Sequence, residues 1–434
     1  MLVFKLALKS LLNRRYTVLL TMLSIAISVT LLLSVERIRT QTKANFANTV
    51  SGTDMIVGAR TGEIQLLLSS IFHIGNATNN VSWQTYQRIA NQPNVKWSIP
   101  LSLGDSHKGY RVVGTTNAFF QHYQFGNKQA LILAEGHSFS RSFDVVLGAA
   151  VAATLNYKMG DQLVMAHGTG NTSFAMHNHA PFTVTGILQA TGTPVDRAIY
   201  VSLAGIEAMH STGHAKEASD HKHEHKDEDE HEHEHEHEHE KPTQLLQNQP
   251  PQQITAFLLG LKSRIMTLMA QRQINQFKAE PLLAIMPNLT LHQLWEMMDL
   301  VEQALLIISA CVLVSALIGM LTTLLTSLNE RRREMAILRS VGARPHHIII
   351  LMISEAFLIT LFGCLLGIAL LYVSMIALQP IAASTLGVYL ELSFISRLEW
   401  QLLSVILGAS VIIGAIPAFK AYRMSLSDGM NVKV

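Results

Sequence analysis

The chain has 434 residues, of which 49% are hydrophobic and only 15% are charged, with a formal net charge of +2. An average soluble domain carries roughly a quarter charged residues, so this composition indicates a protein that is partly embedded in lipid. No basic stripe with interleaved aromatic residues occurs, which argues against nucleic acid as a partner. Both cysteines lie in apolar stretches, so no disulfide framework is predicted.

The first long apolar stretch is predicted to span a membrane. Residues 17–35 contain no charge, and as a helix they would reach about 28 Å, enough for one crossing. The run is longer than the apolar core of a cleavable signal peptide and is followed by charged residues, which favours an uncleaved anchor. We assign residues 1–35 to an N-terminal amphipathic helix and this first span.

Residues 36–299 are predicted to form a large mixed α+β domain. Short apolar runs bounded by turn signals are typical of β-strands. They occur at residues 54–59, 110–116, 130–136, 144–149, 162–168, 182–188, 198–203 and 254–261. Helical patterns lie at residues 84–92 and 264–277, and residues 290–299 are expected to be helical and to lead into the next span.

A run rich in histidine and glutamate interrupts this domain at residues 210–253, where the low complexity predicts a disordered insertion. Its imidazoles are candidate ligands for Zn²⁺, or for Cu²⁺ or Ni²⁺. These metal-ligating candidates are His221, His223, His225, His231, His233, His235, His237 and His239. The alternative is a solvated linker whose metal affinity has no cellular role.

Two other metal hypotheses are weaker. The repeat formally satisfies the HExxH pattern of zinc peptidases, but a peptidase needs these residues on a rigid helix packed in a core, and the run has no apolar face. His167, His177 and His179 flank a predicted loop. Scattered surface histidines are the simpler interpretation of that loop.

Three further spans are predicted at residues 300–326, 347–377 and 401–419. Basic residues gather in the N-terminal segment, in the connector of residues 327–346 and in the tail of residues 420–434. The positive-inside rule places these three segments in the cytoplasm, and places residues 36–299 and 378–400 on the other side. Arg37, Arg39 and Lys43 weaken this bias, although long domains cross a membrane largely regardless of charge.

The connector is predicted to be a short amphipathic helix. Glu330 precedes Arg333 by three residues, an interval that allows pairing on a helix, and Gly342 supplies a helix stop before Pro345. A helix ringed by arginine suits docking onto a soluble cytoplasmic partner. An ordinary positively charged loop in contact with anionic lipids is the alternative.

The connector sequence NERRREMAILRSVGARPHHI resembles that of FtsX-like ABC-transporter permeases, the group of MacB-type and lipoprotein-releasing LolC/LolE-type proteins. The segments FKLALKSLLNRRYTVLLTMLSIAISV and PAFKAYRMSLSDGM extend the resemblance to both ends of the chain. The resemblance implies four transmembrane helices with a large mixed α+β periplasmic domain between helices 1 and 2. It also implies a multi-pass protein of the Gram-negative inner membrane, with cytoplasmic N- and C-termini.

The same resemblance implies that the connector carries a coupling helix, at residues 334–343, that fits a groove in an ATPase subunit. The residues expected to contact the ATPase are Arg331, Arg332, Arg333, Glu334, Ile337, Leu338, Arg339, Gly342 and Ala343. No GxxxxGK[ST] motif occurs, so ATP is expected to be bound by the partner, and the chain itself is expected to be no enzyme and to hold no intrinsic cofactor.

By this resemblance, the chain is expected to be a permease subunit that converts ATP hydrolysis by its partner into a periplasmic conformational change, which we call mechanotransmission. A second permease copy is an expected partner, in a homodimer or a heterodimer, and a periplasmic or outer-membrane partner is compatible with the resemblance. The alternative function is a zinc-responsive periplasmic sensor or scaffold that regulates a membrane partner through the histidine run.

Three residues of the third span are expected to support helix packing. Gly363 and Gly367 form a pattern of small residues that allows the backbones of two helices to approach closely. Glu355 lies about two turns into the span, where a hydrogen bond to a neighbouring helix is favoured over a proton relay. Polar residues are otherwise sparse in the spans, which argues against a solute pathway.

Overall fold

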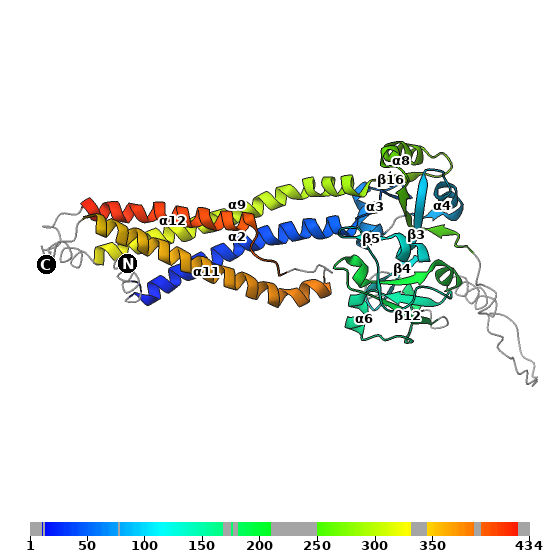
Figure 1. Cartoon of the computed structure of the whole chain (residues 1–434), viewed down its shortest axis with the longest axis horizontal. Helices are drawn as coiled ribbons and strands as arrows, with labels where there is room; N and C mark the ends of the chain where they lie inside the picture. The colour runs from blue at the N-terminus through cyan, green and yellow to red at the C-terminus, as the bar shows by residue number, and fades with distance from the viewer. Residues whose placement is uncertain are drawn as a thin grey trace, which may run out of the picture. The chain divides into compact units, whose positions relative to one another are not determined.

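The structure is a computed structural model that describes residues 11, 14–76, 79–167, 175–176, 181–209, 250–330, 345–385 and 392–423. The chain divides into two compact units (Figure 1). One, which we call the helix bundle, consists mainly of residues before Lys43 and after Met297. The other, which we call the interspan domain, covers Lys43–Met297.

Four helices among the described residues are long and apolar enough to cross a membrane. They are α2 (Arg15–Thr49), α9 (Pro287–Glu330), α11 (Pro345–Thr385) and α12 (Arg397–Arg423). The predicted class, four apolar helices with a mixed α+β domain between the first and the second, is confirmed. Helices α2 and α9 extend beyond the apolar runs of the sequence, so each supplies residues to both units.

The core of the helix bundle is made of side chains from all four helices. Ile25 of α2, Met320 of α9, Ile359 of α11 and Ile406 of α12 belong to one buried cluster. Between α2 and α9, the hydroxyl groups of Thr21 and Thr323 lie 3.3 Å apart and share a hydrogen bond. Because lipid tails are as apolar as these side chains, such close packing and interhelical hydrogen bonds hold the helices together.

The interspan domain is built on one large mixed sheet. Its main path runs β16 (Leu282–Ile285), β1 (Met55–Ala59), β15 (Ala256–Leu261), β3 (Val95–His107), β4 (Tyr110–Thr115), β13 (Ala198–Ser202), β8 (Asp144–Leu147), β12 (Phe182–Leu188) and β7 (Leu133–Gly136). The β13–β4 and β12–β8 pairs are parallel, and the other pairs on this path are antiparallel. Three short strands extend this sheet away from the main path: β9 (Gln162–Leu163) pairs with β12, and β10 (Ala166–His167) pairs with β3 and with β11 (Ala175–Met176). Two separate pairs are β2 (Val81–Ser82) with β14 (Gln253–Ile254), and β5 (Gln124–Phe125) with β6 (Gln129–Ala130).

Both faces of this sheet are covered, because alternate residues of its strands belong to different cores. Ile56 of β1 and Leu258 of β15 lie in one cluster, whereas their neighbours Met55 and Leu259 lie in another, as the two-residue period of a strand requires. The helices of the domain are α3 (Glu63–Ser70), α4 (Trp83–Ala90), α5 (Asn117–His122), α6 (Ala149–Leu155) and α8 (Thr267–Asn275), with 3₁₀ turns η1 (Pro194–Arg197) and η3 (Arg264–Met266).

Each predicted strand run coincides with at least one strand, and both predicted helical patterns coincide with helices, α4 and α8. The predicted helix at residues 290–299 is the start of α9. The long central strand β3 was not predicted, because Pro100 and Gly104 interrupt its alternation of apolar and polar residues. A shift of register between Leu103 and Ser106, where β3 pairs with β4, accommodates this irregularity.

Candidate functional site

Two groups of predicted site residues lie outside the described residues. These are the nine connector residues expected to contact an ATPase, Arg331, Arg332, Arg333, Glu334, Ile337, Leu338, Arg339, Gly342 and Ala343, and the eight histidines of the insertion, His221 to His239. His177 and His179 also lie outside them, whereas His167 lies on β10, opposite Asp105 of β3. Within the described ranges, no group of three or more His, Cys, Asp or Glu residues could hold a metal ion.

The predicted glycine pair of the third span faces α2. A methyl group at Gly363 would lie 2.8 Å from the Cγ2 atom of Ile25, and one at Gly367 would lie 2.9 Å from the carbonyl oxygen of Ala26. The Thr30 hydroxyl donates a 2.9 Å hydrogen bond to the Gly367 carbonyl oxygen. The absence of side chains on these glycines therefore allows α2 and α11 to approach closely. Helix α2 is thus the partner helix, which the sequence alone did not identify.

A third close approach was not predicted. A methyl group at Gly414 of α12 would lie 2.6 Å from the Cβ atom of Ala356 in α11. Ala356 follows Glu355, whose side chain is almost completely buried in the bundle. Helix α11 therefore packs closely against α2 on one side and α12 on another.

A buried ion pair joins α2 to α12 near the start of α12. The Nε and Nη2 atoms of Arg37 donate hydrogen bonds of 2.9 and 3.1 Å to the two carboxylate oxygens of Glu399. Only 3% of Arg37 and 2% of Glu399 is exposed. A two-point contact of this kind fixes the orientation of both groups as well as their separation.

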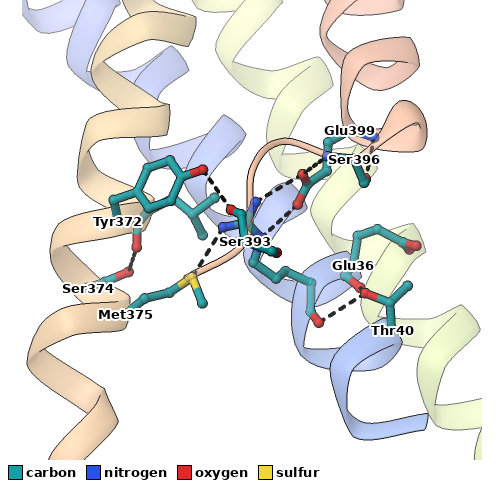
Figure 2. A network of polar contacts seen from close by, with 10 residues as sticks. Glu36, Thr40, Tyr372, Ser374, Met375, Ser393, Ser396 and Glu399 are labelled. Carbon is teal, nitrogen blue, oxygen red and sulfur yellow. Dashed lines mark hydrogen bonds and ion pairs between the residues drawn. The ribbon is translucent and has the colours of Figure 1, made fainter. Parts of the chain in front are cut away.

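Other groups, from α11 and from the start of α12, contact this ion pair (Figure 2). The backbone N–H of Ser396 donates a 2.7 Å hydrogen bond to Glu399, which places the carboxylate at the first turn of α12. Tyr372 and Met375 come from α11: the Tyr372 ring centroid lies 5.1 Å from the Arg37 guanidinium carbon, and the Met375 sulfur lies 3.5 Å from Nη1. The ion pair and the side chains in contact with it thus come from three of the four spans, α2, α11 and α12.

A second ion pair links α2 to the remaining span. Arg39 lies 3.2 Å from a carboxylate oxygen of Glu302 in α9 and 3.4 Å from Glu36 in its own helix. Its side chain is 34% exposed, so this contact is weaker than the buried pair. We call the two ion pairs, Arg37–Glu399 and Arg39–Glu302, the polar joint, because together they connect α2 with α9, α11 and α12.

The polar joint accounts for two of the three charges that complicated the topology prediction, those of Arg37 and Arg39. Arg37 and Arg39 follow the first apolar run and weaken its charge bias, but in the structure each lies beside a carboxylate. Because the net charge of such a pair is small, these arginines need not remain in the cytoplasm. The signal available in the sequence was a charged residue close to one end of each of three apolar runs. These residues are at positions 37, 302 and 399, and position 302 lies just inside its run.

Comparison with known proteins gives two matching families. The family described as "FtsX-like permease C-terminal" matches residues 306–426, and the family described as "MacB-like periplasmic core domain" matches residues 18–223. These segments include residues of all four membrane-crossing helices and a large part of the interspan domain.

Curated relatives match over a shorter segment. The macrolide export ATP-binding/permease protein MacB of Shewanella sp. (strain W3-18-1) is 32% identical over 128 residues, which cover 29% of this chain and 19% of that protein. The protein of the same name from Escherichia coli is 34% identical over 125 residues, 28% of this chain and 18% of the relative. The matched segment therefore spans about a fifth of the length of these relatives.

The matches to solved structures are distant in sequence. The periplasmic region of MacB from Actinobacillus actinomycetemcomitans is 12% identical, with a TM-score of 0.33 over 58% of this chain and 97% of that one. The extracellular domain of the noncanonic ABC-type transporter YknZ from Gram-positive bacteria is also 12% identical, with a TM-score of 0.29 over 54% of this chain and 99% of that one.

Proposed function

The chain belongs to the FtsX-like, MacB-type family of ABC-transporter permeases, and on that premise we propose that it is a membrane subunit driven by a separate cytoplasmic ATPase. The printed residues contain no phosphate-binding GxxxxGK[ST] motif, so in this proposal ATP is bound elsewhere. In this proposal the connector and both termini lie in the cytoplasm of a Gram-negative cell, and the interspan domain lies in the periplasm. Two copies of the chain form the transporter.

The proposed mechanism is mechanotransmission through the helix bundle. ATP-driven closure of the ATPase subunits moves the connector, which joins α9 to α11. The observation that carries this proposal is the buried Arg37–Glu399 pair, because its two-point geometry allows α2 and α12 to shift against each other only if the pair breaks. The Arg39–Glu302 pair and the contacts of Gly363 and Gly367 extend the coupling to α9 and α11.

Helices α2 and α9 are the ones that deliver the movement to the interspan domain. Both supply residues to the bundle and to that domain, whereas the described parts of α11 and α12 belong to the bundle. A displacement of the bundle thus reaches the domain through the backbone of two helices. This division favours work on a periplasmic substrate or partner, without a solute path through the spans.

The coupling assignment is tested by charge removal in the connector. We expect Arg333→Ala, Glu334→Ala or Arg339→Ala to reduce both the amount of an ABC ATPase that copurifies with the full chain from native membranes and its stimulated turnover. Lys420→Ala, which removes a basic residue near the end of α12 instead, is the matched control and should retain both. If the three connector variants couple normally, the assignment is wrong.

The histidine run supports a second role for the same chain. Eight histidines within residues 221–240 offer a high local concentration of imidazole ligands, and we propose that they bind Zn²⁺ in the periplasm and adjust transport. Deleting residues 219–241 distinguishes a transporter that zinc adjusts from a zinc sensor. A transporter tuned by metal should keep its basal ATPase coupling without the run, whereas a sensor should lose its only response.

A further inference from the structure

A cavity of about 410 Å³ lies in the helix bundle at the end where α2 begins, α9 ends and α11 begins. We call this the connector end. Its wall includes Arg14, Thr17, Thr322 and Glu355, together with apolar side chains such as Ile359. The cavity therefore combines a cation, an anion and hydroxyl groups with an apolar surface, within a unit that crosses the membrane.

The two charged groups lie at nearly the same depth in the bundle. Gly363 meets Met22 and Ile25, and Gly367 meets Ala26 and Val29, so α11 runs parallel to α2 with a constant offset. Glu355 precedes Gly363 by about two turns and is therefore level with the first turn of α2. Arg14, whose Nη2 atom donates a 3.4 Å hydrogen bond to the Ser327 carbonyl oxygen, comes just before that turn.

The groups around Glu355 are suited to a ligand that donates hydrogen bonds. Glu355 is only 2% exposed and already takes part in a polar interaction within the structure. An ionised carboxylate is purely an acceptor with about four lone-pair sites, so it can accept hydrogen bonds from a ligand as well. The hydroxyl groups of Thr17 and Thr322 already donate to the carbonyl oxygens of Arg14 and Gly319, so toward a ligand their oxygens offer lone pairs. A primary ammonium group, with three donors and no acceptor, matches this surface.

The guanidinium group of Arg14, which lines the same cavity, is suited to phosphate. Arginine presents several N–H donors in a planar arrangement that fits phosphate oxygens. We propose that the cavity binds the headgroup of a zwitterionic phospholipid with a primary ammonium group, of the phosphatidylethanolamine class. Its ammonium group lies toward Glu355, its phosphate lies toward Arg14, and its apolar part lies against Leu324 and Ile359.

Other common headgroups fit the cavity less well. An anionic headgroup without a cation, as in phosphatidylglycerol, would be repelled by the Glu355 carboxylate. The quaternary ammonium group of phosphatidylcholine carries the right charge but has no N–H donor for the carboxylate or the hydroxyl groups. The charges of this cavity therefore predict a preference among lipids and not merely an affinity for lipid.

Native mass spectrometry of the delipidated full chain in detergent tests this proposal. The probes are phosphatidylethanolamine, phosphatidylcholine and phosphatidylglycerol with identical acyl chains, and soluble phosphoethanolamine. We expect phosphatidylethanolamine to bind about tenfold more tightly than the other two lipids, the ratio that one charge-assisted hydrogen bond provides. Soluble phosphoethanolamine should bind more weakly than the lipid, and equal binding would exclude a lipid as the ligand.

Variants distinguish the two halves of the site. Glu355→Gln should abolish the preference for phosphatidylethanolamine over phosphatidylcholine, and Arg14→Gln should weaken the binding of all three lipids. Thr322→Val keeps the charges and should reduce phosphatidylethanolamine binding several-fold, which provides a test if Glu355→Gln fails to fold. The control is Ser309→Ala in α9, because that hydroxyl bonds within its own helix to the Leu305 carbonyl oxygen and lies outside the cavity.

Two results would overturn the proposal. The first is a wild-type chain that binds phosphatidylcholine or phosphatidylglycerol as tightly as phosphatidylethanolamine. The second is a preference for phosphatidylethanolamine that persists in folded Glu355→Gln and Thr322→Val proteins, since the preference would then arise elsewhere on the chain.

Discussion

The helix bundle and the interspan domain bury charged groups in different ways. In the bundle, the Arg37 guanidinium contacts the carboxylate of Glu399, a residue 362 positions away in sequence on another helix. In the interspan domain, the fully buried Asp196 carboxylate accepts hydrogen bonds from the backbone N–H groups of Thr191 and Gly192, only a few residues away. Burial raises the pKa of Asp196, and these hydrogen bonds partly offset the rise.

This difference indicates what each buried charge does. A pair between distant helices fixes the position of one helix relative to another, so its loss should be felt by the whole bundle. A carboxylate held by the backbone of its own turn shapes that turn, so its loss should remain local. The proposed transmission of movement between helices therefore requires the first kind of contact.

The largest expected effect comes from breaking the buried pair on one side. Arg37→Met leaves the Glu399 carboxylate buried without its guanidinium and should destabilise the bundle by about 3–5 kcal/mol. The double variant Arg37→Met/Glu399→Leu removes both charges and should recover most of that loss. Equilibrium unfolding of the full chain in mixed micelles measures both.

The matched control is Arg39→Met, which breaks the more exposed ion pair and should cost no more than about 1 kcal/mol. If the double variant is no more stable than the single one, or if the control costs as much as Arg37→Met, the buried pair does not have the role assigned to it.

The His73 imidazole should make the interspan domain sensitive to acid. Burial, with a smaller contribution from the positive charge of Arg111, lowers the pKa of His73 from 6.5 to about 4. The folded domain therefore binds this proton less readily than the unfolded chain. The domain should lose up to about 3 kcal/mol of stability as the pH falls from about 6.5 to about 4, at about 1.4 kcal/mol for each pKa unit.

Hydrogen exchange of the full chain as a function of pH measures this change unit by unit. His73→Asn removes the titrating group and suits the positive φ of 57° at this position, because Asn tolerates left-handed backbone. The variant should flatten the pH dependence of the domain between these values. An equal acid response in the wild-type and variant domains would exclude His73 as its source.

Close backbone contacts give a smaller and more local test of the bundle. Gly363→Ala places a methyl group 2.8 Å from Ile25 and should cost about 1–3 kcal/mol through overpacking. Gly408→Ala in α12 meets no atom within 4 Å, so it should be neutral or stabilise its helix by up to about 1 kcal/mol. Unfolding in the same micelles compares the two, and equal effects would mean that α2 does not approach α11 at Gly363.

The smallest expected effect concerns a charge held locally in the interspan domain. Burial raises the pKa of Glu280, but hydrogen bonds from Thr85 and from the backbone N–H and hydroxyl of Ser82 outweigh it and lower the pKa below 4.5. The carboxylate therefore contributes stability above pH 4.5, and this contribution is lost as the pH falls through the lower, folded-state pKa. Glu280→Gln should cost the domain about 1 kcal/mol at neutral pH and leave exchange in the bundle unchanged.

The parts of the fold that were predictable are those in which a local pattern decides the structure. Strands such as β4 and β12 alternate apolar residues between turn signals, and the four spans are long runs with few charged residues. Strand β3 was not predictable because its place in the sheet depends on neighbouring strands that accommodate Pro100 and Gly104. The C-terminal extension of α2 beyond residue 35 was also missed, since charges end an apolar run but do not end a helix.

The candidate site was less predictable than the fold. The glycine spacing in the third span indicated a close contact, but the partner helix depended on packing over more than 300 residues of sequence. The same holds for Arg37, whose partner at position 399 no local pattern identifies. The roles of the connector residues and of the histidine run remain predictions from resemblance and from composition.

The proposed transmission of force requires the connector and the interspan domain to lie on opposite sides of the membrane. Single cysteines at Arg339 and at Glu63, in a chain whose Cys311 and Cys364 are replaced by alanine, can be labelled in intact spheroplasts with a membrane-impermeant maleimide. We predict that the cysteine at position 63 is labelled and that the one at position 339 is labelled only after the membrane is permeabilised. Labelling at position 339 in intact spheroplasts would place the connector outside the cytoplasm, where no cytoplasmic ATPase could bind it.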